Sequence, residues 1–293
     1  MIALDTIRLN AMAKINLGLD VTGKRPDGYH DVRMVMQMVK LYDRIDMEKT
    51  AQPGIHVTCS FPFLPCDDRN IAYKAARLMT ERYGCSGGIN IRIEKHIPVA
   101  AGMAGGSTDC AAVLAGMNRL YDLALTQQQL MKIGLELGAD VPYCIMRHTA
   151  LSEGIGEILT AVPPLADCHL IIAKPHISVS TKHVYQSLVL DGDTVHPDID
   201  GIVCALKQGS LAGVASRLGN VLETVTVREH PVIGKIKERL VDDGALGALM
   251  SGSGPTVFGI FDDREKAESA YDSLRSTGLA QQQYLTVPVS FGN

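Results

Sequence analysis

The chain has 293 residues, of which 46% are hydrophobic and 20% charged, and its formal net charge is −4. Its lysines and arginines form no basic stripe, which argues against nucleic-acid binding, and no apolar run approaches the roughly 18 residues that cross a membrane. The seven cysteines contain no Cys-x-x-Cys pair and the N-terminus shows no secretion signal, so we expect reduced thiols in a cytoplasmic protein.

The first predicted element is a long strand over residues 7–21, where apolar and polar residues alternate strictly. Lys14 and Asn16 fall on its polar face, about 7 Å apart along the strand, so both can point at one ligand. Pro26 and Gly28 then demand a turn, and an extended pattern resumes after it. The two extended segments predict a hairpin-like unit.

A helix is expected over residues 70–83, ended by Gly84, and a half-buried strand over residues 89–94. This strand leads through the stretch 98–109 into a buried, Ala-rich helix around residues 110–117. The stretch 98–109 therefore sits at a helix N-terminus.

The stretch 98–109 carries almost no side-chain bulk, because Gly102, Gly105 and Gly106 lie within five residues of one another. Glycines let the backbone approach an anion closely, and the unsatisfied N–H groups at a helix N-terminus attract phosphate. The stretch 98–109 lacks the Gly-Lys-Ser/Thr sequence of a P-loop and the Gly-x-Gly-x-x-Gly sequence of a dinucleotide-binding fold. The residues favour a phosphate-binding loop of another kind, with a tight strand-to-helix turn as the alternative.

A further helix begins after Thr126, which starts a capping-box pattern, and is expected to stop near Gly138. Asp140 follows at once, where this helix is expected to give way to an apolar strand. A carboxylate at such a position can serve as an acid-base group or simply occupy a turn.

The composition changes at Pro163 and Pro164, and we place a boundary there between domains over residues 1–163 and 164–293. The second domain reads as strand, helices, strand, strand, helix, strand, an order that suits an α+β domain of the ferredoxin-like kind. The expected elements are a strand at 169–173, helical patterns at 198–219 and 231–243, strands at 245–250 and 256–261, a helix at 264–276 and a strand at 284–289. A second glycine-rich stretch, 251–255, joins two of these strands, with a plain hairpin turn as the alternative.

Taken together, the polar strand face, the loop and Asp140 resemble the GHMP kinase family. The family's phosphate loop is similar to Pro98–Ser107, and its late glycine loop to Gly252–Thr256, where Gly252, Ser253 and Gly254 would support the site. The resemblance implies a two-domain α+β fold, with an N-terminal domain like domain 2 of ribosomal protein S5, a C-terminal ferredoxin-like domain and the site in the cleft between them. It also implies ATP as co-substrate.

The resemblance implies a role for each polar residue. Asp140 would orient and deprotonate an alcohol, Lys14 would hold that carboxylate charged and favour the developing alkoxide, and Asn16 would position the pair or the substrate. The alternatives are a turn carboxylate for Asp140 and a solvated strand face for Lys14.

The resemblance also implies which residues surround ATP. The loop would wrap the phosphates through its amides, while Asn70 and Lys95 would lie near the adenosine. The phosphate-loop residues are Pro98, Val99, Ala100, Ala101, Gly102, Met103, Ala104, Gly105, Gly106, Ser107 and Thr108. For Asn70 we slightly favour a helix N-cap, and for Lys95 a solvent-facing strand end.

A narrower match lies at Ala13–Leu17 and in the stretch Arg25–His30, Arg-Pro-Asp-Gly-Tyr-His. Both resemble the branch of the family whose substrate carries a cytidine diphosphate, and imply phosphorylation of the 2-hydroxyl of its methylerythritol unit in the non-mevalonate route to isoprenoids. Tyr29 would stack on the base and His30 would read its polar edge. Tyr185 would form a second aromatic wall, with core packing as the alternative, and Thr181 would lie near the substrate.

This sequence departs from the family pattern at Ala100 and Ala101, which replace glycines, and at Met103-Ala104, which replace Leu-Gly. Mg²⁺ is expected on the ATP phosphates, and the sequence identifies no protein ligand for it. The sequence leaves the oligomeric state open. Other GHMP kinases, acting on homoserine, mevalonate or a sugar, and a non-catalytic nucleotide-binding or nucleic-acid-associated module remain alternatives.

Overall fold

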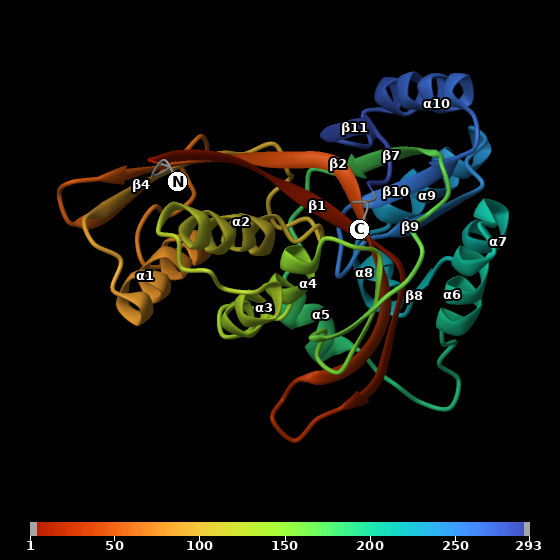
Figure 1. Cartoon of the computed structure of the whole chain (residues 1–293). Coiled ribbons are helices and arrows are strands. Elements are labelled where there is room, and N and C mark those ends of the chain that lie inside the picture. The colour runs from red at the N-terminus through yellow and green to blue at the C-terminus, as the bar shows by residue number, and fades with distance from the viewer. Residues whose placement is uncertain (1–4, 290–293) are drawn as a thin grey trace. The chain divides into compact units, whose positions relative to one another are not determined.

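The computed structural model describes residues 5–289 and divides into two compact units, each assembled from separate stretches of the chain (Figure 1). Unit 1 comprises Met1–Ala13, Leu41–Ile97 and Ala104–Arg147. Unit 2 comprises Lys14–Lys40, Pro98–Met103 and His148–Asn293. Two long strands, β1 (Thr6–Lys24) and β2 (His30–Thr50), contribute residues to both units. The domain boundary predicted at residues 163 and 164 is not tested by this division, so it stays a prediction.

Unit 1 is a sheet covered by four helices. Within it, β2 pairs antiparallel with β4 (Gly88–Glu94), which pairs parallel with β3 (Gly54–Cys59). Figure 1 shows the four helices on one side of these strands: α1 (Ile71–Tyr83), α2 (Gly105–Leu120), α3 (Gln127–Leu135) and α4 (Val141–Met146). Gly116 lets α2 pack closely, because a Cβ there would lie 2.3 Å from Met47 Sδ.

Local signals set the helix boundaries of unit 1. Asn70 caps the start of α1 by accepting a hydrogen bond from Ala72 N–H, and Gly84 ends the helix in the left-handed conformation. Thr126 and Gln129 form the expected capping box of α3. The strand expected directly after Asp140 is wrong, since that segment forms helix α4. Proline in the first turn of a helix is tolerated, because the N–H it lacks has no partner there, and so Pro142 fits.

Unit 2 begins with the second part of β1 and the first part of β2. There β2 pairs antiparallel with β5 (Ala150–Glu153), which pairs with β6 (Ile158–Ala161). On the other side, β1 pairs parallel with the short β8 (Gly219–Asn220). These strands carry Lys14 and Asn16, as well as the turn at Arg25–His30.

The rest of unit 2 contains a four-stranded sheet in the order β11-β7-β10-β9, with every neighbouring pair antiparallel. Its strands are β7 (His169–Lys174), β9 (Gly247–Met250), β10 (Val257–Phe261) and β11 (Gln282–Thr286). The order is that of a ferredoxin-like domain, so this expectation is confirmed.

Six helices accompany this sheet: α5 (Thr181–Ser187), α6 (Ile199–Lys207), α7 (Leu211–Ala215), α8 (Glu223–Glu229), α9 (Val232–Asp242) and α10 (Arg264–Thr277). The expected helical stretch at 198–219 is two helices separated by a turn, and α8 was not predicted from the sequence. The expected strand at 284–289 begins two residues earlier and ends three residues earlier, as β11.

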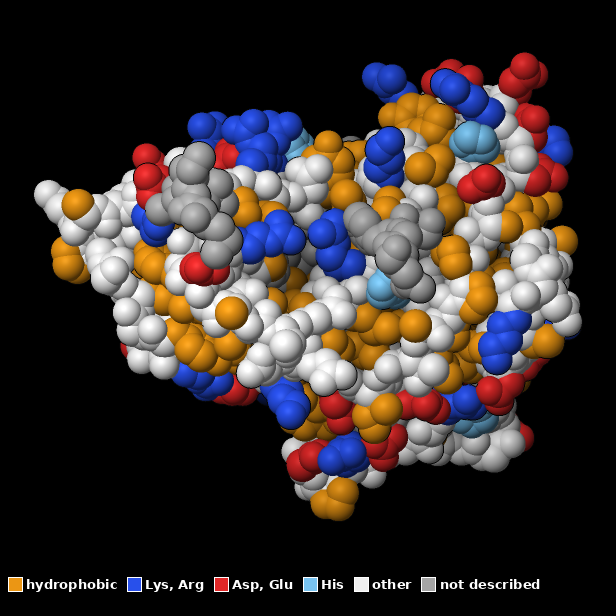
Figure 2. Space-filling model, viewed as in Figure 1, with side chains coloured by type: hydrophobic (Ala, Val, Ile, Leu, Met, Phe, Trp, Pro, Cys, Tyr) orange, Lys and Arg blue, Asp and Glu red, His pale blue; other side chains and the backbone are white. Residues whose placement is uncertain are grey.

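All seven cysteines are free thiols. On the face drawn in Figure 2, acidic and basic side chains are interspersed with apolar ones. In residues 5–289, no helix is long and apolar enough to cross a membrane.

Candidate phosphotransfer site

The predicted polar face of β1 holds a buried lysine–asparagine pair. Lys14 Nζ donates a hydrogen bond of 2.7 Å to Asn16 Oδ1, and the two residues are only 4% and 0% exposed. Their common face is confirmed, whereas the solvated alternative for Lys14 is wrong. Within residues 5–289 the ammonium forms no ion pair with a carboxylate. Because burying an unpaired cation is costly, this position favours an anionic ligand.

The phosphate loop runs directly beside this pair. Lys14 N–H donates to the carbonyl of Met103 at 3.2 Å. Left-handed φ angles occur at Ala100 (50°), Gly102 (70°) and Ala104 (57°). Ala100 and Ala104 therefore adopt the left-handed backbone conformation that glycine usually occupies, and each costs about 1–2 kcal/mol of conformational free energy.

The late glycine loop packs against the first half of the phosphate loop. Ser251 Oγ donates to the carbonyl of Gly102 at 3.0 Å and accepts from Asn16 N–H at 3.3 Å. A Cβ at Gly102 would lie 2.0 Å from the Ser251 carbonyl oxygen, so only glycine fits. The stretch 251–255 is thus both the hairpin turn between β9 and β10 and a direct neighbour of the phosphate loop.

Side chains from three other elements hold the late glycine loop. Asn220 Nδ2 donates to the carbonyls of Met250 and Gly252 at 2.8 and 2.7 Å. Thr226 Oγ1 donates to the carbonyl of Ser253 at 3.3 Å, while the hydroxyls of Ser253 and Thr181 lie 2.8 Å apart. Sequence reasoning did not single out Ser251 or Asn220, whose roles depend on contacts distant in sequence.

The second half of the phosphate loop leads into α2. Ala104 is the N-cap residue, and no side chain caps this helix end. The N–H groups of Gly105, Gly106 and Ser107 therefore lie in the first turn without the side-chain partner that usually satisfies such groups. Such a helix end attracts phosphate.

Lys95 does not lie at the solvent-facing strand end that the sequence predicted. It is buried rather than solvent-facing, and Nζ donates to Asp43 Oδ2 and, at 2.7 Å, to Asp109 Oδ2. Burial alone would lower the pKa of Lys95, but the neighbouring carboxylates of Asp109 and Asp43 outweigh it and raise that pKa. Neither Asp43 nor Asp109 was among the predicted site residues.

Asp140 lies at the N-terminus of α4 and is half-buried. Its side chain makes no capping hydrogen bond to the helix. The carboxylate is therefore not used as a cap, and its role as an acid-base group stays a prediction.

The side chain of Asn70 has a structural use, as the favoured N-cap reading expected. Oδ1 accepts from Ala72 N–H at 2.9 Å, and Nδ2 donates to the carbonyl of Pro65 at 2.7 Å. Its place near adenosine stays a prediction.

The turn Arg25–His30 presents two of the predicted substrate-binding rings. Arg25 N–H donates to the Tyr29 carbonyl at 2.8 Å, and Tyr29 is 58% exposed. The ring centroids of His30 and Tyr185 lie 5.2 Å apart. Burial, and then the charge of Lys24, lower the pKa of His30, so its ring is neutral at neutral pH and can accept a hydrogen bond.

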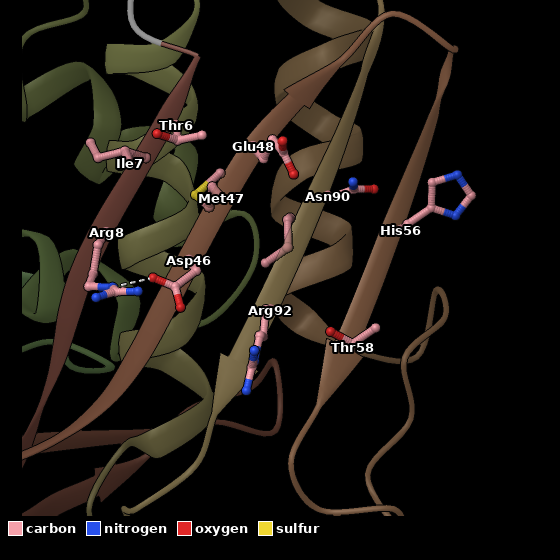
Figure 3. Close-up of a pocket in the computed structure, with 11 residues that line it drawn as sticks. Thr6, Ile7, Arg8, Asp46, Met47, Glu48, His56, Thr58, Asn90 and Arg92 are labelled. Atoms are coloured by element: carbon pink, nitrogen blue, oxygen red, sulfur yellow. Dashed lines mark hydrogen bonds and ion pairs between the residues drawn. The ribbon is translucent and has the colours of Figure 1, made fainter.

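A cavity of about 590 Å³ in unit 1 contains none of the predicted site residues (Figure 3). It lies over the sheet face away from the helices, where Arg8 pairs with Asp46 and where Asn90 and Arg92 project. In the part of the chain that the structure describes, no three His, Cys, Asp or Glu side chains are arranged to hold a metal ion.

Comparison with known proteins gives matches over almost the whole chain. Residues 70–148 match the GHMP kinases N terminal domain, and residues 203–279 match GHMP kinases C terminal. A protein of Lachnospira eligens named 4-diphosphocytidyl-2-C-methyl-D-erythritol kinase is 54% identical over 97% of this chain and 98% of its own length. One of the same name from Lachnoclostridium phytofermentans is 52% identical over 97% of each.

A solved structure of 4-(cytidine 5'-diphospho)-2C-methyl-D-erythritol kinase is similar to the chain with a TM-score of 0.83 and 31% identity, covering 98% of this chain and 100% of that one. The two-domain fold of mixed α/β content expected from the sequence is therefore confirmed. These matches show that the chain belongs to the GHMP kinase family of phosphotransferases, within the group named 4-diphosphocytidyl-2-C-methyl-D-erythritol kinases.

Proposed function

We propose that this chain transfers the γ-phosphate of ATP to the 2-hydroxyl of 4-diphosphocytidyl-2-C-methyl-D-erythritol, giving the 2-phosphate and ADP in the non-mevalonate route to isopentenyl diphosphate. The observation that carries the proposal is the buried Lys14 ammonium, hydrogen-bonded to Asn16 on a strand whose backbone bonds the phosphate loop. The named relatives support the choice of substrate.

Phosphoryl transfer needs alignment of the alcohol with the γ-phosphate, stabilisation of charge and a group that takes the alcohol's proton. In this proposal the Asp140 carboxylate accepts that proton. The Lys14 ammonium stabilises the negative charge that develops during transfer, and its hydrogen bond to Asn16 fixes its direction.

The phosphate loop would bind ATP through its backbone. The N–H groups at the start of α2 lack a capping side chain and can donate to phosphate oxygens, with Ser107 or Thr108 completing the site. Mg²⁺ would accompany the ATP phosphates and neutralise part of their charge. In this proposal the side chains of Asn70 and Lys95 do not contact ATP, because they already have hydrogen-bond partners. Only the backbone near these two residues would lie beside the nucleotide.

The cytidine end would be held by the turn Arg25–His30 and by α5. Tyr29 supplies an exposed aromatic face for the base, and a stack of this kind contributes about 1–3 kcal/mol in nucleic-acid complexes. Neutral His30, in contact with Tyr185, can accept a hydrogen bond from the base's amino group. The free cysteines support a reducing compartment, and we place the reaction in the cytoplasm.

The test is a mass-spectrometric phosphorylation assay with ATP, Mg²⁺ and the diphosphocytidyl substrate beside homoserine and mevalonate. We expect the diphosphocytidyl substrate alone to gain one phosphate. Asp140→Asn should lower kcat by about 10²–10⁴ with an unchanged melting curve. Phosphorylation of homoserine or mevalonate instead, or an Asp140→Asn chain with full kcat, would contradict the proposal.

A further inference from the structure

A buried ion cluster joins the residues on either side of the phosphate loop. It consists of Asp43, Lys95 and Asp109, whose side chains are 0%, 4% and 6% exposed. Asp43 comes from β2, Lys95 follows the end of β4, and Asp109 lies early in α2. The function proposed above gives none of these side chains a role.

The hydrogen bonds of the cluster hold both flanks of the loop. On the N-terminal side of the loop, Asp43 Oδ1 accepts hydrogen bonds from His96 N–H and, at 2.8 Å, from Ile97 N–H, which directly precedes Pro98. On the C-terminal side of the loop, Lys95 Nζ donates a hydrogen bond of 2.7 Å to Asp109 Oδ2 on α2. Gly105 brings the two flanks together, since a Cβ there would lie 3.2 Å from Ile97 Cγ2.

The two carboxyl groups of the cluster differ in their hydrogen bonds. Asp43 accepts hydrogen bonds from the Lys95 ammonium and from two backbone N–H groups. Asp109 accepts only from Lys95, and its Oδ1 is buried without a partner among the described residues. Burial raises the pKa of Asp109 well above its usual range.

We propose that Asp43, Lys95 and Asp109 are positioning residues for ATP, because together they fix the spacing between the two flanks of the phosphate loop. The Asp109–Lys95 bond is the link between α2 and the end of β4, and it needs an oxygen acceptor at position 109 rather than a negative charge. The inference rests on the proposed function, since it assumes that this loop binds ATP.

The experiment measures binding of the non-hydrolysable ATP analogue AMPPNP with Mg²⁺ by calorimetry, and separately the KM of each substrate. Asp109→Ala and the bulkier Asp109→Leu both remove the link yet leave the neutral Asp43–Lys95 ion pair. Asp109→Asn keeps an acceptor oxygen. Arg239→Met, which breaks an ion pair of 2.7 Å between Arg239 on α9 and the C-cap residue Asp243, is the control.

We expect Asp109→Ala and Asp109→Leu to weaken AMPPNP binding and raise the KM for ATP about tenfold or more, because small displacements of a binding loop are costly. The KM for the diphosphocytidyl substrate should stay within about twofold, and Asp109→Asn and Arg239→Met should bind AMPPNP like the wild type. The Leu variant keeps the test decisive if the Ala variant does not fold.

Two results would overturn the inference. Wild-type AMPPNP affinity in a folded Asp109→Ala or Asp109→Leu chain would show that the cluster only stabilises the fold. Equal weakening by Asp109→Asn would show that a negative charge is required. A wild-type chain that binds AMPPNP but phosphorylates no alcohol would sink the proposed function alone, because the binding comparison still decides the role of Asp109.

Discussion

The two halves of the phosphate loop are held by different chemistry. The first half is fixed by neutral groups, since Gly102 packs on the Ser251 backbone and accepts from its hydroxyl. The second half leads into α2, whose start is tied to the end of β4 by the ion cluster of Asp43, Lys95 and Asp109. Removing one partner of a buried neutral hydrogen bond costs about 1–3 kcal/mol, whereas cutting a buried ion pair costs about 3–5 kcal/mol because it leaves an uncompensated charge. The halves should therefore differ in their sensitivity to substitution.

The largest effect is expected from Gly102→Ala, which tests the close packing of the first half. The added Cβ would meet the Ser251 carbonyl oxygen, and the φ of 70° is unfavourable for alanine. We expect a loss of at least about 4 kcal/mol in unfolding free energy, the range reached only by severe clashes. Chemical denaturation measures it, with Gly106→Ala as control, because its Cβ would have 3.6 Å to the nearest atom. Equal stability of the two variants would contradict the packing argument.

Asp43→Ala tests the charged anchor of the second half. The substitution removes a carboxylate that is 0% exposed and leaves two backbone N–H groups without their acceptor. The expected destabilisation is about 3–5 kcal/mol, as for other buried ion pairs cut on one side. Asp46→Ala, which removes the carboxylate of an exposed pair with Arg8, should cost less than about 1 kcal/mol. Similar denaturation midpoints for both would rule out a structural role for the cluster.

Ser251→Ala tests the neutral anchor and should have a smaller effect. It removes the hydrogen bond to Gly102 and leaves Asn16 N–H buried without an acceptor. We expect about 2 kcal/mol of destabilisation and a raised KM for ATP. Ser276→Ala, at an exposed position on α10, is the control. If Ser251→Ala costs as much as Asp43→Ala, the contrast between the two halves fails.

The pH dependence of stability provides the finest test. Because the pKa of Asp109 is raised in the fold, the folded chain holds a proton that the unfolded chain releases above about pH 4. The free energy of unfolding of the wild type should then fall as pH rises above this value, by at most about 1.4 kcal/mol per pH unit, until the folded group ionises. Asp109→Asn should lack this contribution, so its stability relative to the wild type should increase as pH rises above about 4, as denaturant titrations can measure. A parallel pH dependence in both proteins would contradict a proton on Asp109.

Local patterns were enough to predict much of the fold. The alternation along β1, the cap residues Asn70 and Gly84 and the capping box at Thr126 each act over a few residues, so their effects can be recognised in the sequence. The helix α4 after Asp140 escaped this reasoning, because a short apolar run suits a buried helix as well as a strand.

By itself, the sequence determined the strand with Lys14 and Asn16, a phosphate loop in which alanines replace some of the family's glycines, and the family to which they point. The tertiary structure decided that Lys14 is buried, that Lys95 is paired rather than solvent-facing, and that Ser251 supports Gly102. These contacts join residues separated by 52 positions for Lys95 and Asp43, and by 149 for Ser251 and Gly102. Burial and charge pairing depend on which distant segments meet, and periodicity within one segment does not specify that.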